Sequence, residues 1–353
     1  MDLMQLRTRL RDDYTISRVI KGGWQLAGGH GPIDEQQAIA DMRDFVSAGI
    51  TTFDCADIYT GVEELIGKFL KKYRHDFISG ELPPVQVHTK YVPDLDALAT
   101  VSKVDTEKII DRSLKRLGVE RLDLVQFAWW DYSVPRYVEV CLHLAELQKA
   151  GKIRYIGATN FNLSSLREML DAGCPIITNQ VQYSVLDARP AGAMQGFIQQ
   201  HDMSYLCYGS VAGGFLTEKY LGATECQFAE NRSLVKYQLI IEETGGFDQF
   251  QHLLQVLKNI ANVHNVKIAE VAARYVLQQE AVSAVIIGAR NARHLPGLQK
   301  IAGLELDAPE VEEIRSVIAE GTGVPGDVYD IERDRNGPHG RIMKYNLNQA
   351  VSR

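Results

Sequence analysis

Apolar and polar positions follow two alternating patterns along the first two thirds of the chain. Short apolar runs are separated by stretches in which apolar residues recur at the spacing of an α-helix. Such helical faces precede Gly49, Gly118, Gly151 and Gly173, where glycine supplies the left-handed conformation that ends a helix. The short runs predict eight strands, at residues 19–24, 51–55, 85–89, 122–127, 154–158, 176–179, 204–207 and 284–287.

Alternating strands and helices predict a parallel sheet with right-handed crossovers. Eight such units close an α/β fold, the (β/α)₈ TIM barrel, which takes about 250 residues. We therefore expect one domain over residues 1–353, with the barrel at about 15–310. The residues beyond those that the barrel needs lie in extended loops, mainly 213–246, and in a C-terminal tail at about 321–353. We expect this tail to lie over the barrel mouth as a lid that excludes water, rather than at a subunit interface.

A doubly wound dinucleotide-binding sheet is the alternative fold, because the glycine-rich stretch GGWQLAGGHG follows the first strand at residues 22–31. Its glycines do not have the GxGxxG spacing, and no helix opens directly on them. The stretch is better interpreted as a turn beside the pocket.

Composition excludes several classes of partner. The 353 residues are 45% hydrophobic and 24% charged, as in ordinary globular proteins, and the net charge of −7 comes without a basic stripe that would bind nucleic acid. No apolar run reaches the roughly 20 residues of a membrane span, and the N-terminus does not resemble a signal peptide. Five cysteines have no CxxC spacing, so we expect no metal site and reduced thiols in a cytoplasmic protein.

Candidate catalytic residues lie at the carboxyl ends of strands, where barrel enzymes carry their chemistry. Asp54 ends the second strand, Tyr59 lies in the following loop, and Lys90 ends the third. We expect the Lys90 charge to lower the pKa of Tyr59 from about 10, while Asp54 keeps the lysine charged. Tyr59 would then act as a general acid or base. Singly, the three residues also fit a turn cap, loop packing and a solvated strand end, but their joint placement favours a site.

Polar residues recur at the ends of later strands: Thr159, Asn160, Gln180 and Tyr208. Amide and hydroxyl groups beside an aromatic ring suit a flat amide-bearing ring such as nicotinamide. Ordinary loop capping by Asn and Thr explains the same residues equally well.

The order and spacing of several motifs are similar to those of the aldo-keto reductase superfamily over about residues 15–310. These motifs are FDCADIYTGVEELIG, HTKY, GATNF, NQVQY, CYGSVAGGFLTEKY and IIGARNARHL. The resemblance implies a barrel that binds NADP(H) across its carboxyl face. It places Asp54, Tyr59 and Lys90 at three of the four catalytic positions.

The same resemblance implies the residues that bind the cofactor. Thr159, Asn160 and Gln180 match those that hold the carboxamide, and Tyr208 matches the ring stacked on nicotinamide. Arg290 matches the position that grips the 2′-phosphate, and Ser210 lies in the loop near the pyrophosphate.

The sequence departs from the family pattern at one residue, Ala128, and in one short segment, residues 296–298. Ala128 stands where the family has its fourth catalytic residue, a histidine, and a methyl group can neither give nor take a proton. Residues 296–298 read Pro-Gly-Leu where the family usually carries Glu and Asn for the adenosine half of the cofactor. Each lost hydrogen bond costs about 0.5–1.5 kcal/mol, so we expect weaker cofactor binding.

We predict an NADP(H)-dependent oxidoreductase that interconverts a carbonyl and an alcohol on a small molecule. The alternatives are a non-redox elimination, isomerisation or cyclisation on the same barrel, and a cofactor-binding regulatory subunit. The expected pocket wall contains Ala128 and the aromatic residues Trp24, Tyr91 and Trp129, and we expect at least one of Trp129 and Trp130 to be ordinary core.

Overall fold

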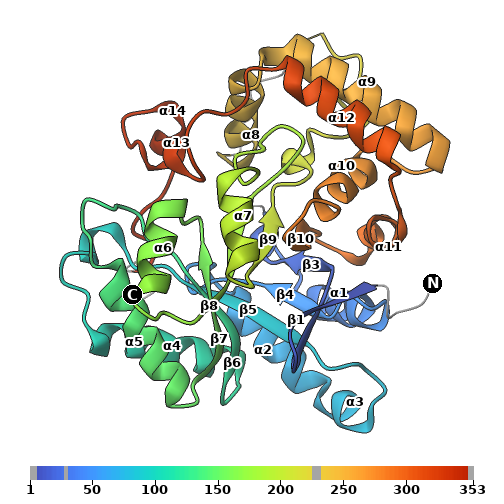
Figure 1. The fold of residues 1–353 in the computed structure, drawn as a ribbon. Helices are drawn as coiled ribbons and strands as arrows, with labels where there is room; N and C mark the ends of the chain where they lie inside the picture. The colour runs from blue at the N-terminus through green and yellow to red at the C-terminus, as the bar shows by residue number, and fades with distance from the viewer. Residues whose placement is uncertain (1–5, 28–30, 225–231, 349–353) are drawn as a thin grey trace.

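The computed structural model describes residues 6–27, 31–224 and 232–348. In that part of the chain, eight parallel strands close a barrel surrounded by helices (Figure 1). The predicted TIM barrel and its eight strands are confirmed. In barrel order, the strands are β10 (Val282–Gly288), β3 (Val19–Gly22), β4 (Thr52–Asp54), β5 (Gln86–Tyr91), β6 (Leu122–Phe127), β7 (Ile153–Thr159), β8 (Ile176–Gln182) and β9 (Ser204–Tyr208).

Helices connect successive strands and form the outer layer of the barrel. After β9 the chain makes a longer excursion, through α8, α9 and α10, before it returns as β10. The α-helices are α1 (Glu35–Ser47), α2 (Val62–Lys72), α3 (Arg74–Ser79), α4 (Lys103–Leu117), α5 (Tyr137–Lys149), α6 (Leu163–Asp171), α7 (Ala193–Gln200), α8 (Arg232–Glu243), α9 (Gly246–His264), α10 (Ile268–Leu277), α11 (Leu295–Gly303), α12 (Ala308–Glu320), α13 (Asp330–Arg333) and α14 (Pro338–Arg341).

Helix α4 illustrates how local sequence sets the ends of these elements. The Ser102 hydroxyl accepts a hydrogen bond from the Asp105 backbone N–H, and the Asp105 carboxylate accepts one in return from the Ser102 backbone N–H, which satisfies two otherwise unpaired donors. Gly118 then ends the helix with φ 67°, a conformation that glycine adopts without steric cost.

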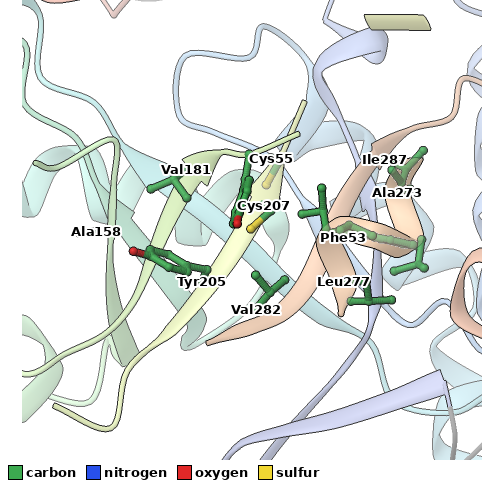
Figure 2. Close-up of a cluster of buried hydrophobic side chains, with 14 of the residues drawn as sticks. Phe53, Cys55, Ala158, Val181, Tyr205, Cys207, Ala273, Leu277, Val282 and Ile287 are labelled. Carbon is green, nitrogen blue, oxygen red and sulfur yellow. The ribbon is translucent and has the colours of Figure 1, made fainter. Parts of the chain in front are cut away.

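Two hydrophobic layers hold the barrel together. The larger layer lies between the strands and the outer helices; Figure 2 shows the part in which Phe53, Val282 and Ile287 lie beside Ala273 and Leu277 of α10. The smaller layer fills the barrel interior. Its buried members are Leu10, Tyr14, Ile16, Ile20, Leu124, Ile177, Leu206, Ala284 and Ile286.

An N-terminal hairpin, which the sequence pattern did not predict, closes the amino end of the barrel. It pairs β1 (Arg7–Arg11) with β2 (Tyr14–Ser17), and Leu10, Tyr14 and Ile16 join the interior layer. The Tyr14 hydroxyl and His88 Nε2 share a 3.0 Å hydrogen bond. Burial, aided by the Lys90 charge, lowers the pKa of His88 to about 3, so this imidazole is neutral.

Three sequence segments are described in part. In the predicted long loop 213–246, residues 225–231 lie outside the described residues. Within residues 22–31, Trp24–Leu26 form one 3₁₀ turn, and residues 28–30 lie outside the described residues. In the tail, α13 and α14 lead away from α12 toward the C-terminal mark in Figure 1, and residues 349–353 lie outside the described part.

Candidate active site

The ends of β4 and β5 place a buried ion pair at the carboxyl face of the barrel. Lys90 Nζ donates to Asp54 Oδ2 at 2.7 Å and to the Cys55 carbonyl at 2.9 Å. Each side chain of the pair is only 6% exposed. Because side chains alternate along a strand, Lys90 points into the barrel one layer above His88.

Two glutamines complete the hydrogen bonding of Asp54. Its second oxygen, Oδ1, accepts from Gln180 Nε2 at 2.7 Å and from Gln126 Nε2 at 3.2 Å. Gln180 Nε2 also donates to Gln126 Oε1 at 2.9 Å. Sequence reasoning missed Gln126, although it lies near the carboxyl end of β6, where the other candidate residues were sought.

Gly157 of β7 leaves the room that the Thr178 hydroxyl needs, and it also lies close to the Gln126 side chain. A β-carbon at this position would lie 2.3 Å from Thr178 Oγ1 and 3.3 Å from Gln126 Cγ. The glycine of the GATNF motif is therefore explained by packing inside the barrel rather than by a turn.

Tyr59 lies above the ion pair in the loop between β4 and α2. Its ring centre is 4.9 Å from Lys90 Nζ, and its side chain is partly exposed. The Trp24 ring packs edge-on against it at 5.0 Å, and Trp24 Nε1 donates to Ser233 Oγ of α8 at 3.0 Å. The structure thus brings together the three predicted catalytic residues.

The electrostatics of this group differ from the expectation in one respect. Burial acts to lower the pKa of Lys90, but the Asp54 carboxylate and Tyr59 more than offset it, so the pKa is raised and the lysine stays charged. Burial raises the pKa of Tyr59 above 10, and the opposing effect of Lys90 does not cancel it. The expected net lowering of the Tyr59 pKa is wrong, because desolvation of the phenolate is the larger effect.

The predicted carboxamide-binding residues lie together at the ends of β7, β8 and β9. Thr159 pairs with Gln180 in the sheet, and its hydroxyl donates to the Gln180 carbonyl at 3.2 Å. Asn160, held at φ 61°, accepts a 2.9 Å hydrogen bond from the Tyr208 hydroxyl on its Oδ1.

The loop after β9 has features that fit a bound phosphate group. Ser210 Oγ is buried and has no hydrogen-bond partner among the described residues, so a ligand oxygen would satisfy it. Gly209 and Gly213 beside it have positive φ, and a β-carbon on either would lie within 2.8 Å of the Tyr237 ring or hydroxyl. Arg290, two residues after β10, donates to the Pro32 carbonyl in the loop after the neighbouring strand β3.

The predicted pocket wall needs correction at two positions. Tyr91 and Trp129 are 1% and 2% exposed and pack outside the barrel: the Tyr91 hydroxyl bonds Thr106 of α4, and the Trp129 indole donates to two loop carbonyls. Tyr91 follows the inward-facing Lys90 by one residue, so strand alternation turns it away from the pocket. Trp129 lies beyond the end of β6, and its ring packs against Phe127 and against Tyr137 of α5. Ala128 is partly exposed at the end of β6, with its N–H bonded to the Tyr91 carbonyl at 3.0 Å.

Helix α8 and the tail add residues to the mouth that sequence reasoning missed. Lys236 Nζ lies 5.1 Å from the Tyr208 ring centre and 3.6 Å from Glu332 of α13. Glu332 is fully buried and also pairs with Arg189 at 3.0 Å. Burial acts to raise the pKa of Glu332, but the charges of Lys236 and Arg189 more than offset it. The pKa is lowered to about 2, so the carboxylate is ionised.

Three further contacts tie the tail to the ends of β6 and β7. Arg333 donates to the Asn160 carbonyl at 2.5 Å and stacks its guanidinium 4.2 Å from the Tyr132 ring centre. The Tyr345 ring meets Trp130 edge-on at 5.2 Å. Trp130, rather than Trp129, is therefore the tryptophan on the tail side of the mouth.

A cavity of about 260 Å³ lies between α9, α12 and the loop after β8. Arg189 and the first residues of the tail line it, and none of the predicted site residues does. Across residues 6–27, 31–224 and 232–348, no His, Cys, Asp and Glu side chains gather as a metal-binding group. No helix in that part is both long enough and apolar enough to cross a bilayer.

Comparison with known proteins identifies the family. The sequence profile of the aldo/keto reductase family matches residues 18–319, most of the chain. The chain belongs to this family. It is 28% identical to the aldo-keto reductase YhdN of Bacillus subtilis over 309 residues, which cover 86% of this chain and 90% of that protein.

Solved structures of similar fold agree with the barrel. The glycerol dehydrogenase AKR11B4 of Gluconobacter oxydans superposes with a TM-score of 0.75 at 22% identity, over 92% of this chain and 98% of that one. An aldo/keto reductase of Klebsiella pneumoniae, solved with NADP and acetate, gives 0.66 at 19% identity, over 91% and 97%. Family membership makes this chain an NAD(P)H-dependent carbonyl/alcohol oxidoreductase.

Proposed function

We propose that this aldo/keto reductase interconverts a carbonyl and an alcohol with NADP(H), and that Tyr59 transfers the proton. The observation that carries the proposal is the buried Lys90–Asp54 pair directly beneath the Tyr59 ring. A charged lysine held at 2.7 Å from its carboxylate keeps a fixed positive charge where negative charge develops in the transition state.

In the direction of reduction, Tyr59 donates its hydroxyl proton to the substrate oxygen as that oxygen gains negative charge. Its raised pKa keeps Tyr59 protonated at neutral pH, which suits an acid. In the reverse direction Tyr59 must first lose the proton, and the Lys90 charge stabilises the phenolate. NADP(H), when bound, supplies or accepts the hydride.

Several residues of this chain would hold the cofactor. Asn160 and Thr159 offer amide and hydroxyl groups to the carboxamide, and the Tyr208 ring offers a stacking surface. Ser210, buried without a partner, would donate to a phosphate oxygen. Arg290 would pair with the 2′-phosphate, which supports NADP(H) over NAD(H), in line with the NADP bound by the Klebsiella pneumoniae relative.

We further propose that Ala128 replaces the histidine of the family and that the tail 321–348 is a lid. A methyl group at the partly exposed end of β6 leaves space for a water that bridges Tyr59 and the substrate oxygen. Contacts of Arg333 and Tyr345 with the ends of β6 and β7 support the lid. Removing the residues from Gly326 onward should therefore weaken substrate binding and slow turnover.

The methyl group at Ala128 also favours a second candidate function, a non-redox acid–base reaction. The Asp54–Lys90–Tyr59 group would serve an elimination, isomerisation or cyclisation without hydride transfer. Both candidates use Tyr59, but they differ in their need for the cofactor.

Titration with NADPH and NADH separates the two functions. We expect protein fluorescence to be quenched by NADPH at lower concentration than by NADH, and aldehyde substrates to consume NADPH. Fluorescence unchanged by either cofactor at millimolar concentration would contradict the redox proposal. Product formation without change in the nicotinamide absorbance would support the second candidate.

A further inference from the structure

The last described residues of the tail run along the loop between β5 and α4, beside the candidate active site. The Tyr345 carbonyl accepts from the Leu95 N–H at 3.0 Å. Asn346 and Asn348 extend this contact through their side chains, but to different partners. Asn346 bonds the exposed Asp96, whereas Asn348 reaches inward and is only 8% exposed.

Asn348 uses both ends of its side-chain amide in this position. Its Nδ2 donates to the Val92 carbonyl at 2.7 Å and to Asp57 Oδ2 at 3.0 Å, and its Oδ1 accepts from Arg112 of α4. Its backbone N–H donates to Asp94 Oδ1 at 2.8 Å. An amide bonded on both sides in a buried position has one orientation, so Asn348 locks the end of the tail.

Asp57 connects this lock to the proposed acid. It is fully buried at the start of the turn that ends at Tyr59, whose N–H bonds the Ala56 carbonyl at 3.0 Å. The Asp57 carboxylate accepts from the Val92 N–H at 3.2 Å and from Asn348, while its second oxygen has no partner among the described residues. Asn348 is therefore the tail residue that helps hold this carboxylate, across 291 positions of sequence.

We propose that Asn348 is a positioning residue: through Asp57 it fixes the turn 56–59 and so sets the Tyr59 hydroxyl over Lys90. This inference rests on the proposed role of Tyr59 as the proton donor. Proton and hydride transfer depend steeply on geometry, and a displacement of about 1 Å can cost on the order of 10²-fold in rate. The tail would then act on the chemical step as well as on substrate access.

The test compares Asn348→Ala with Asn346→Ala in the full-length enzyme, using NADPH and an aldehyde that the parent reduces. Asn346 is a matched control, because it is the same residue type on the same segment and bonds only the exposed Asp96 among the described residues. We expect Asn348→Ala to lower the single-turnover rate of NADPH oxidation about tenfold or more. The NADPH dissociation constant should stay within about twofold, and Asn346→Ala should match the parent in both measurements.

A second pair of variants separates positioning from loss of folding. Asn348→Asp sets a carboxylate against Asp57 and should be slower than Asn348→Ala. Adding Asp57→Asn restores one amide–carboxylate pair with the roles exchanged, so the double variant should be at least about fivefold faster than Asn348→Asp alone. A structural role that only loosens the fold would lower the melting temperature without this rescue.

Three results would overturn the inference. One is an Asn348→Ala rate equal to that of the parent, and another is an equal loss in Asn346→Ala and Asn348→Ala. The third is a double variant no faster than Asn348→Asp alone. Failure of the proposed function is recognised separately, because a Tyr59→Phe enzyme would then be as active as the parent. If Tyr59→Phe is inactive while Asn348→Ala is fully active, only the positioning role is lost.

Discussion

The two ends of the barrel are closed in opposite ways. At the amino end, a hairpin that immediately precedes β3 inserts Leu10, Tyr14 and Ile16 into the apolar interior. At the carboxyl end, a tail from the far end of the sequence lies on the strand-end loops and is held by ion pairs and hydrogen bonds.

The difference shows where this protein keeps stability and where it keeps chemistry. Apolar closure is non-directional and excludes water from a layer that has no reaction to perform. Polar closure fixes directions, and it sets the Asn348 amide against Asp57, in the turn that leads to Tyr59. His88 marks the boundary, since it bonds Tyr14 below and lies one layer under Lys90 above. Changes at the amino end should therefore alter stability, and changes at the mouth should alter activity.

The largest expected effect comes from two matched tyrosines. Tyr59→Phe should lower kcat/KM about 10²–10⁴-fold, because it removes the proton donor. Tyr14→Phe removes a hydroxyl bonded to His88 and should cost about 1 kcal/mol of stability with activity unchanged. Steady-state kinetics and urea unfolding of both variants test the comparison. Equal activity losses in the two variants would contradict the assignment of activity to the mouth and of stability to the amino end.

Core truncation at the amino end should lower stability without affecting turnover. Ile16 is fully buried, so Ile16→Ala should lower the free energy of unfolding by about 2–5 kcal/mol through lost burial and a residual cavity. Denaturant unfolding measures the loss, and kcat is measured at a temperature where the variant stays folded. A marked fall in kcat of the folded variant would show that the two ends are coupled.

Asp57 predicts a pH dependence at the mouth. Burial, with a smaller contribution from Glu63, raises its pKa to about 7; Asn348, the Val92 N–H and Arg112 act in the opposite direction. Between about pH 4 and pH 7 the unfolded chain has lost this proton while the folded chain keeps it, so stability falls as pH rises through that window.

Asp57→Asn should remove this fall in stability with rising pH, because an amide side chain does not titrate. At about 1.4 kcal/mol per pKa unit, the stability of the variant relative to the parent should rise by about 2–4 kcal/mol between pH 4 and pH 8. Urea unfolding of both proteins at the two pH values measures it. A relative stability that does not change with pH would mean that Asp57 is ionised throughout.

The smallest expected effect is a gain at Ala128. If the native reaction is carbonyl reduction, Ala128→His should raise kcat/KM for simple aldehydes by at least about tenfold, because it restores a hydrogen-bond donor at the mouth. If the site serves a non-redox reaction, Ala128→His should have the opposite effect. The imidazole then fills space that the substrate needs, and the native activity disappears. Aldehyde reduction by Ala128→His no faster than that of the parent would exclude the first interpretation.

Local sequence determined most of the framework. Short apolar runs between segments of helical period located the eight barrel strands, and Gly49, Gly118, Gly151 and Gly173 all have the expected positive φ. The sequence could also predict that Asp54 and Lys90 lie at one face of the barrel, because both are at strand ends and parallel strands bring their carboxyl ends to one face. These features depend on neighbours in sequence, which is why a single sequence reveals them.

Tertiary structure decided the rest. Tyr91 faces outward and Gln126 faces Asp54, since one residue of register reverses the direction of a side chain. The pKa of Tyr59 rises because burial outweighs the Lys90 charge, a balance that spacing alone does not reveal. Asn348 meets Asp57 across 291 residues, and such a contact exists only once the barrel has closed. Long-range burial and hydrogen bonding depend on the whole fold, whereas strand and helix patterns do not.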